Sequence, residues 1–129
     1  MARSHDEMYD DFINGQLGKD EWTHEAHLIT CWMALKTRSV DEAISHLRDS
    51  IKAHNCGIGT ANTEYSGYHE TLTVYYVNAV AAVGASTPEE LFVEPTCDRK
   101  APLKHWDKET LFTPEARLNY LAPNLAALT

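Results

Sequence analysis

Apolar residues recur three and four positions apart along much of the chain, which is the spacing of amphipathic α-helices. Residues 6–14 predict a short first helix, because the apolar positions there are followed by two glycines. Residues 22–36 predict a second helix, with Thr23 as a suitable N-cap. The apolar stripe of this second helix consists of Leu28, Cys31, Trp32 and Leu35. We expect that stripe to face the core.

A third helix has the clearest start in the sequence. Ser39 is followed three residues later by Glu42, which is the pattern of a capping box, and apolar positions then continue to Ile51. Residues 55–67 are rich in Gly, Asn, Thr and Ser and predict a substantial loop. Residues 68–83 contain many residues that favour strands, but the length of the apolar run favours a buried fourth helix.

The remainder of the chain predicts short helical pieces. Residues 87–93 begin with a Thr-Pro-Glu-Glu start signal, residues 94–103 look irregular, and residues 113–120 predict a final short helix. We therefore expect an all-α fold, a compact bundle of about five to six helices in one domain over residues 1–129. If the second, third and fourth helices alternate in direction, the second and fourth are parallel and their N-termini meet.

Composition and charge narrow the classes of partner. Hydrophobic residues make up 43% of the 129 residues and charged residues 23%, which is typical of a globular domain. The formal net charge of −8 makes nucleic acids and anionic membranes unfavourable partners, so we expect neither. Three widely spaced cysteines without a CxxC pair, no signal-peptide pattern and no membrane-length apolar run predict a cytoplasmic protein.

Three histidines are the main candidates for chemistry. His24 and His27 are three residues apart, so they share a helix face, and that face continues the apolar stripe of the second helix. His69 precedes an apolar stripe on the fourth helix in the same way. Parallel second and fourth helices would bring all three imidazoles together, and three protein ligands leave a metal an open position. The pattern predicts a divalent metal cofactor, which could be zinc, iron, nickel or copper.

Two other interpretations of the same histidines stay open. The positive end of a helix dipole disfavours a cation but keeps imidazole neutral, so a metal-free acid–base enzyme of lyase or isomerase type, with His69 as the base, is one alternative. The other is a binding or accessory protein, forming a homodimer, whose histidines only bond loop carbonyls.

Further residues fit a small polar or anionic ligand at the predicted site. Tyr68 and Glu70 flank His69 and are candidates for handling a proton. Arg117 is the best placed cation for orienting an anionic substrate, and Asn62 lies in the loop that would line the pocket mouth. Cys31, one turn beyond His27, is interpreted as a small apolar filler rather than as a fourth ligand.

Three segments also carry a resemblance to known sequences: Trp-Thr-His-Glu-Ala-His-Leu at 22–28, Gly-Tyr-His-Glu-Thr-Leu-Thr at 67–73 and Leu-Phe-Thr-Pro-Glu-Ala-Arg at 111–117. Together they resemble a family of small all-helical bacterial proteins of uncharacterised function. Its members read aromatic-x-His-x-x-His, then Tyr-His-Glu-Thr-x-Thr, then Glu-Ala-Arg before a Pro-Asp-Leu tail. Here Asn124 stands at the Asp position, which removes an ionic role there. The resemblance implies that the three histidines act as one set, and it attaches no reaction to them.

Overall fold

The structure is a computed structural model that describes residues 4–128, and every regular element in that range is helical. The α-helices are α1 (His5–Ile13), α2 (His24–Leu35), α3 (Val40–Gly57), α4 (Glu70–Val83), α5 (Glu89–Phe92), α6 (Lys108–Leu111) and α7 (Pro114–Leu118). Three 3₁₀ segments join them: η1 (Lys19–Glu21), η2 (Pro95–Cys97) and η3 (Ala101–Lys104). The predicted all-α fold is confirmed, and the four-residue α6 is the helix that the pattern did not indicate. None of the helices described here is long and apolar enough to cross a membrane.

The predicted helix starts coincide with caps in the structure. The Ser39 side chain accepts a hydrogen bond from the Glu42 backbone, and the Glu42 carboxylate accepts one from the Ser39 backbone, completing the capping box of α3. Thr23 caps α2 by accepting from the backbone N–H of Ala26 at 3.2 Å. Local side-chain chemistry therefore places these helix starts.

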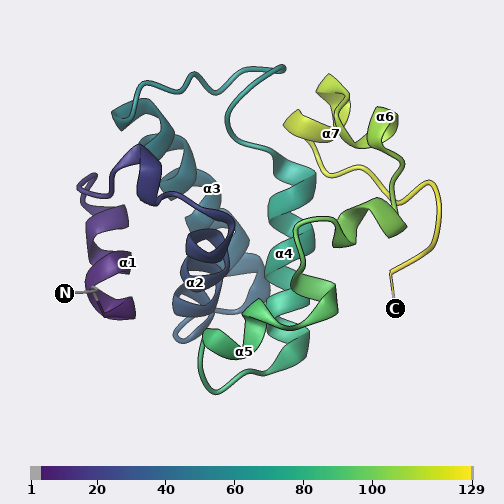
Figure 1. The fold of residues 1–129 in the computed structure, drawn as a ribbon. Coiled ribbons are helices and arrows are strands. Elements are labelled where there is room, and N and C mark those ends of the chain that lie inside the picture. Colours follow the sequence, from purple (N-terminus) through teal and green to yellow (C-terminus); the bar gives the residue numbers. More distant parts are fainter. Residues whose placement is uncertain (1–3, 129) are drawn as a thin grey trace.

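The three long helices α2, α3 and α4 pack on one another and form the centre of the molecule. Figure 1 shows that α2 and α4 run in the same direction. Helix α3, which lies between them in the sequence, runs in the opposite direction, as the alternating arrangement predicts. The core residues Leu28, Leu47 and Val77 come from these three helices, and none is more than 1% exposed. Helix α1 covers α2 and α3 along one side.

The long loop is shorter than the sequence suggests. Residues 55–57 continue α3 to Gly57, so the loop before α4 begins only at Ile58. Asn55 was predicted to lie in the loop, but it is buried at 5% exposure and its amide donates to Asn62 at 2.9 Å. Because the Asn55 side chain is buried and hydrogen-bonded to Asn62, α3 continues to Gly57 instead of ending at a loop.

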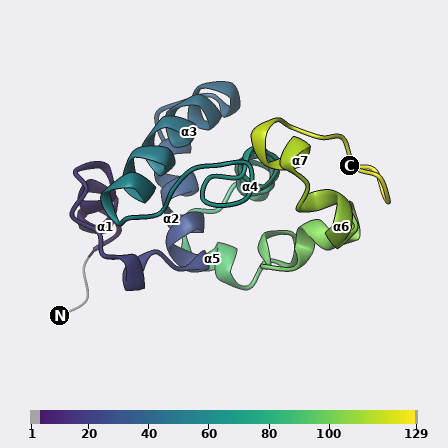
Figure 2. The ribbon, with the colours of Figure 1, turned by 90° about the horizontal axis from the view of Figure 1, so that it is seen from above.

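The C-terminal third packs against the far side of α4 and builds a second small core. Figure 2 shows α6 and α7 on one side of α4 and α1 to α3 on the other. Trp106 is fully buried in this second core, and its indole N–H donates to the carbonyl of Leu121 at 2.9 Å. Thr71 of α4 donates to the carbonyl of Ala116 at 2.6 Å, which ties α7 to the start of α4. The C-terminal third thereby closes over the N-terminal end of α4.

Candidate functional site

A cavity of about 660 Å³ lies where the N-terminal ends of α2 and α4 meet, and all three predicted histidines line it. Most of its wall is apolar or aromatic. The lining residues include Trp22, His24, His27, Cys31, Ile51, Ile58, Tyr68, His69, Leu72, Tyr76, Leu103, Leu111 and Phe112. We call this space the histidine cavity. A space of this size, with an apolar wall and a few polar groups, is typical of small-molecule sites.

His27 is held in one tautomer by its own helix. Its Nδ1 lies 2.7 Å from the carbonyl oxygen of Thr23, and because a carbonyl only accepts, Nδ1 carries the hydrogen. The lone pair is therefore on Nε2. The Trp22 indole packs against the ring at a centroid distance of 3.9 Å. Burial lowers the pKa of His27 to about 4, so the ring is neutral at neutral pH.

His24 is held in the opposite tautomer by the C-terminal third of the chain. Its Nε2 lies 2.8 Å from the carbonyl oxygen of Cys97, so Nε2 donates and Nδ1 keeps the lone pair. The ring meets Tyr76 edge-on at 5.2 Å between centroids. Within residues 4–128, neither His24 Nδ1 nor His27 Nε2 has a hydrogen-bond partner, so each offers a free lone pair.

His69 differs from the other two because both of its ring nitrogens are engaged. Nε2 donates to the carbonyl of Leu111 at 2.7 Å, and Nδ1 accepts from the backbone N–H of Leu72 at 3.2 Å. His69 is thus the N-cap of α4 and also fixes the segment around α6. Burial lowers the pKa of His69. To act as a metal ligand or general base, the ring would have to release the Leu72 N–H, so both predicted roles stay predictions.

The metal site itself also stays a prediction. In the part of the chain that the structure describes, no group of three or more His, Cys, Asp or Glu side chains is arranged to hold a metal ion. Cys31 lines the histidine cavity as a free thiol whose pKa is raised by burial to about 12. A protonated thiol in an apolar wall agrees with its interpretation as a filler.

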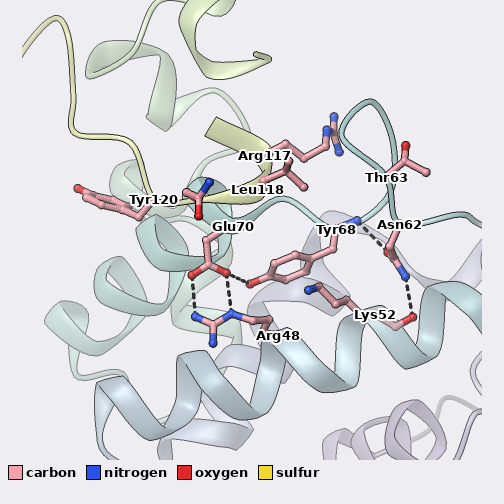
Figure 3. A pocket seen from close by; sticks show the side chains of 10 residues that line it. Arg48, Lys52, Asn62, Thr63, Tyr68, Glu70, Arg117, Leu118 and Tyr120 are labelled. Atoms are coloured by element: carbon pink, nitrogen blue, oxygen red, sulfur yellow. Dashed lines mark hydrogen bonds and ion pairs between the residues drawn. The ribbon is translucent and has the colours of Figure 1, made fainter. Parts of the chain in front are cut away.

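A second pocket of about 320 Å³ lies beside the histidine cavity, and Tyr68 lines both (Figure 3). Glu70 lines only this second pocket. Its two carboxylate oxygens accept from Nε and Nη2 of Arg48 at 2.9 and 2.7 Å, and one of them also accepts from the Tyr68 hydroxyl at 2.7 Å. Burial acts to raise the pKa of Glu70, but the hydrogen bonds from Arg48 and Tyr68 outweigh it and the pKa is lowered. Glu70 is therefore an ionised partner of Arg48 and lies outside the histidine cavity.

Arg117 and Asn62, predicted to bind substrate, also line the second pocket rather than the histidine cavity. Arg117 donates from Nη1 to the carbonyl of Gly67 at 2.9 Å. The Asn62 carbonyl oxygen accepts from Asn55 at 2.9 Å and from the Tyr68 backbone at 3.0 Å, and its amide donates to the Lys52 carbonyl at 2.9 Å. Asn62 thus holds the loop in place.

Sequence reasoning missed two cations of the second pocket, Arg48 and Lys52 on α3. They are four residues apart and so share a helix face, which is the signal that could have found them. An exposed basic face on a helix is common, however, and only the packing of α4 and α7 makes this one part of a pocket.

No protein-family model, no curated protein and no solved structure matches this chain. The resemblance carried by the three sequence motifs therefore stays a prediction.

Proposed function

We propose that the protein is an acid–base enzyme that binds a small, mainly apolar molecule in the histidine cavity. One observation carries this proposal. His24 and His27 project into a single cavity with their tautomers set by backbone carbonyls, and each keeps a free lone pair on its other nitrogen. Preset acceptors of this kind bind an O–H or N–H donor without first reorganising.

We assign the role of base to His27. Its ring is neutral, and the aromatic face of Trp22 fixes its plane. In the proposed step, a C–H bond beside a ligand carbonyl breaks, the proton moves to Nε2 of His27, and the electron pair remains on the ligand as an enolate. Returning the proton to the same carbon completes an exchange with solvent, and in a β,γ-unsaturated ligand returning it to the γ carbon completes an isomerisation. The developing negative charge beside the ring raises its proton affinity, because an opposite charge favours imidazolium.

His69 and Tyr68 support this arrangement. His69 caps α4 and bonds the segment near Leu111, which keeps the wall of the histidine cavity in place. Tyr68 packs as a wall that this cavity shares with the second pocket, and burial raises the pKa of its hydroxyl. Neither residue needs to change protonation state in the proposed step.

Metal binding through His24 and His27 is a second candidate, favoured by a separate observation. Each ring donates its N–H to a backbone carbonyl, as metal-ligating histidines usually do. Two imidazoles from one helix would leave several positions for water or for a small molecule, and they suit zinc, iron, nickel or copper. His69 would become a third metal ligand only if its ring released the backbone N–H of Leu72 at the start of α4.

Solvent exchange tests the acid–base proposal. Small ketones and hydroxyketones are incubated in D₂O with protein that has been treated with a chelator, and the loss of C–H signal is followed by ¹H NMR. We expect protein-dependent exchange in the wild type and its loss in His27→Asn, with Lys104→Gln as a control at an exposed side chain that lines neither pocket. Exchange that is equal in His27→Asn and wild type would contradict the assignment of the base. A strict dimer without any exchange would favour the accessory protein.

Elemental analysis of untagged protein tests the second candidate. The wild type, His27→Ala and His69→Ala are each expressed with zinc, iron, nickel and copper available, and their folding is checked by circular dichroism. Metal lost only in His27→Ala supports a site on α2 alone. Metal lost in both folded variants supports the predicted site of three histidines, and wild type that cannot be loaded rules metal out.

A further inference from the structure

The second pocket is unusual for an acidic protein because cations dominate its lining. Arg48, Lys52 and Arg117 line it together with a single carboxylate, Glu70 (Figure 3). The chain as a whole carries a formal net charge of −8. A cationic pocket on such a surface concentrates anions locally, against the repulsion of the rest of the molecule.

The single carboxylate neutralises only one of the three cations. Glu70 forms its ion pair with Arg48 at 2.7 Å and turns toward that side of the pocket (Figure 3). Lys52 places its ammonium 5.3 Å from the centroid of the Tyr68 ring. Between residues 4 and 128, no carboxylate lies within ion-pair distance of Lys52 or Arg117. Lys52 interacts with Glu70 only through a longer-range attraction that helps to lower the pKa of that carboxyl group. Neither Lys52 nor Arg117 therefore has a direct ion-pair partner among the described residues, and in this sense the two cations are uncompensated.

Arg117 is also short of hydrogen-bond partners. Its Nη1 donates to the carbonyl of Gly67, but its Nε is buried and has no partner. Burial without a counter-charge lowers the pKa of Arg117. An unpartnered buried N–H of a guanidinium costs free energy. An oxyanion beside the guanidinium would supply the counter-charge that Arg117 lacks.

The two uncompensated cations are not adjacent. Figure 3 shows Lys52 on one side of the Tyr68 side chain and Arg117 on the other, next to the loop that carries Asn62 and Thr63. The Tyr68 side chain lies between the two cations in this view. A ligand with two separated anionic groups would match the two positions and their combined charge.

We propose that the second pocket binds a small organic dianion with two separated carboxylates, one paired with Lys52 and the other with Arg117. A pocket of about 320 Å³ is large enough for a short dicarboxylate with a few waters. Tyr68 lines both this pocket and the histidine cavity, so the ligand would lie beside the wall that the two share. The dianion site does not depend on the proposed acid–base function, and either can fail alone.

Titration with succinate tests the proposal on the full-length chain, with ¹H–¹⁵N NMR shifts reporting binding and sodium chloride holding the ionic strength constant. Acetate provides one carboxylate and inorganic phosphate provides one compact oxyanion. Because a second charged hydrogen bond adds stabilisation, we expect succinate to bind at least about tenfold more tightly than acetate. Equal affinity for acetate, or tighter binding of phosphate, would overturn the two-group site.

Three variants locate the ligand. Lys52→Gln and Arg117→Gln should each weaken succinate about tenfold. Lys104→Gln removes the same charge from an exposed position outside both pockets and should leave the affinity unchanged. Lys52→Gln is the safer variant for folding, because Lys52 is exposed and its ammonium forms no direct ion pair among the described residues. Equal effects of Lys52→Gln and Lys104→Gln would overturn the proposal, whereas His27→Asn should keep full succinate binding.

Discussion

The histidine cavity and the second pocket share the wall formed by Tyr68, but they hold their polar groups in different ways. In the histidine cavity, backbone carbonyls fix the neutral rings of His24 and His27 and leave one nitrogen of each unbonded. In the second pocket, side-chain charges dominate, and only Arg48 has a carboxylate partner.

This difference separates two kinds of recognition. A neutral imidazole loses little by burial and can be held ready by the backbone, so the histidine cavity suits proton transfer or ligation inside an apolar wall. Cations lose more on burial, which agrees with the exposure of Lys52 in the second pocket. The second pocket therefore suits electrostatic binding without chemistry.

The largest expected effect comes from Gly67, which lies between the two pockets. Its φ of +79° is a left-handed conformation, and a Cβ there would lie 2.4 Å from the carbonyl oxygen of Ala61. Gly67→Ala should therefore lower the free energy of unfolding by about 4 kcal/mol, from backbone strain together with the clash. It should weaken ligand binding in both pockets. Urea denaturation measures the first effect and NMR titration the second.

Gly59→Ala is the matched control for that substitution. Gly59 has a similar φ of +82°, but nothing lies within 4 Å of an added Cβ. Only the backbone strain remains, so Gly59→Ala should lower the free energy of unfolding by about 1 kcal/mol. If the two variants were equally destabilised, the close approach of Gly67 to the loop would not matter.

The pH dependence of stability should be the next largest effect, and it belongs to the histidine cavity. The pKa of His27 is about 4 in the folded chain and about 6.5 when unfolded, so in this window the unfolded chain binds a proton that the folded chain does not. The free energy of unfolding should therefore fall as the pH drops from 6.5 to 4, by about 3 kcal/mol at most, and stop changing through this group below 4.

Urea denaturation across that range, in buffer with chelator, checks the prediction. His27→Asn should show a flatter dependence on pH. Some slope should remain in the variant, because burial also lowers the pKa of His69. A variant with the same slope as the wild type would mean that His27 is not the group responsible.

Glu70→Gln tests the second pocket and should lower stability less than Gly67→Ala or the acid titration of His27. It removes the charge opposite Arg48, whose side chain is 37% exposed, so solvent limits the expected loss to about 2 kcal/mol. It also adds a third uncompensated positive charge, so succinate should bind more tightly. The exposed pair of His5 and Glu89 offers a control, because Glu89→Gln should change neither stability nor binding measurably. Weaker succinate binding in Glu70→Gln would contradict the electrostatic account.

Most of the fold could be predicted because its signals are local. Capping residues such as Thr23 and Ser39 bond backbone groups three residues away, so the sequence alone reveals these helix starts. The helical spacing of the apolar stripe places His24 and His27 on the inward face of α2. The end of α3 was less predictable, because the burial of Asn55 depends on a contact with Asn62 in the following loop.

The sequence did not predict which of these residues line which pocket. Glu70 is adjacent to His69 in the chain, yet the two side chains line different spaces, since His69 is the N-cap of α4 in extended backbone and Glu70 is the first residue of the helix. Arg117 was expected beside the histidines, but its bond to the Gly67 carbonyl holds it on the other side of Tyr68.

By itself, the sequence determined an all-helical fold and the gathering of three histidines at one end of it, because helix caps and apolar phase act over three or four residues. The tertiary structure alone decided what those histidines can do. The tautomer of His24 depends on Cys97, 73 residues away, and the engagement of His69 depends on Leu111, 42 residues away. A backbone carbonyl can be supplied by any residue type, so no sequence pattern marks these partners, and only packing brings them to the ring nitrogens.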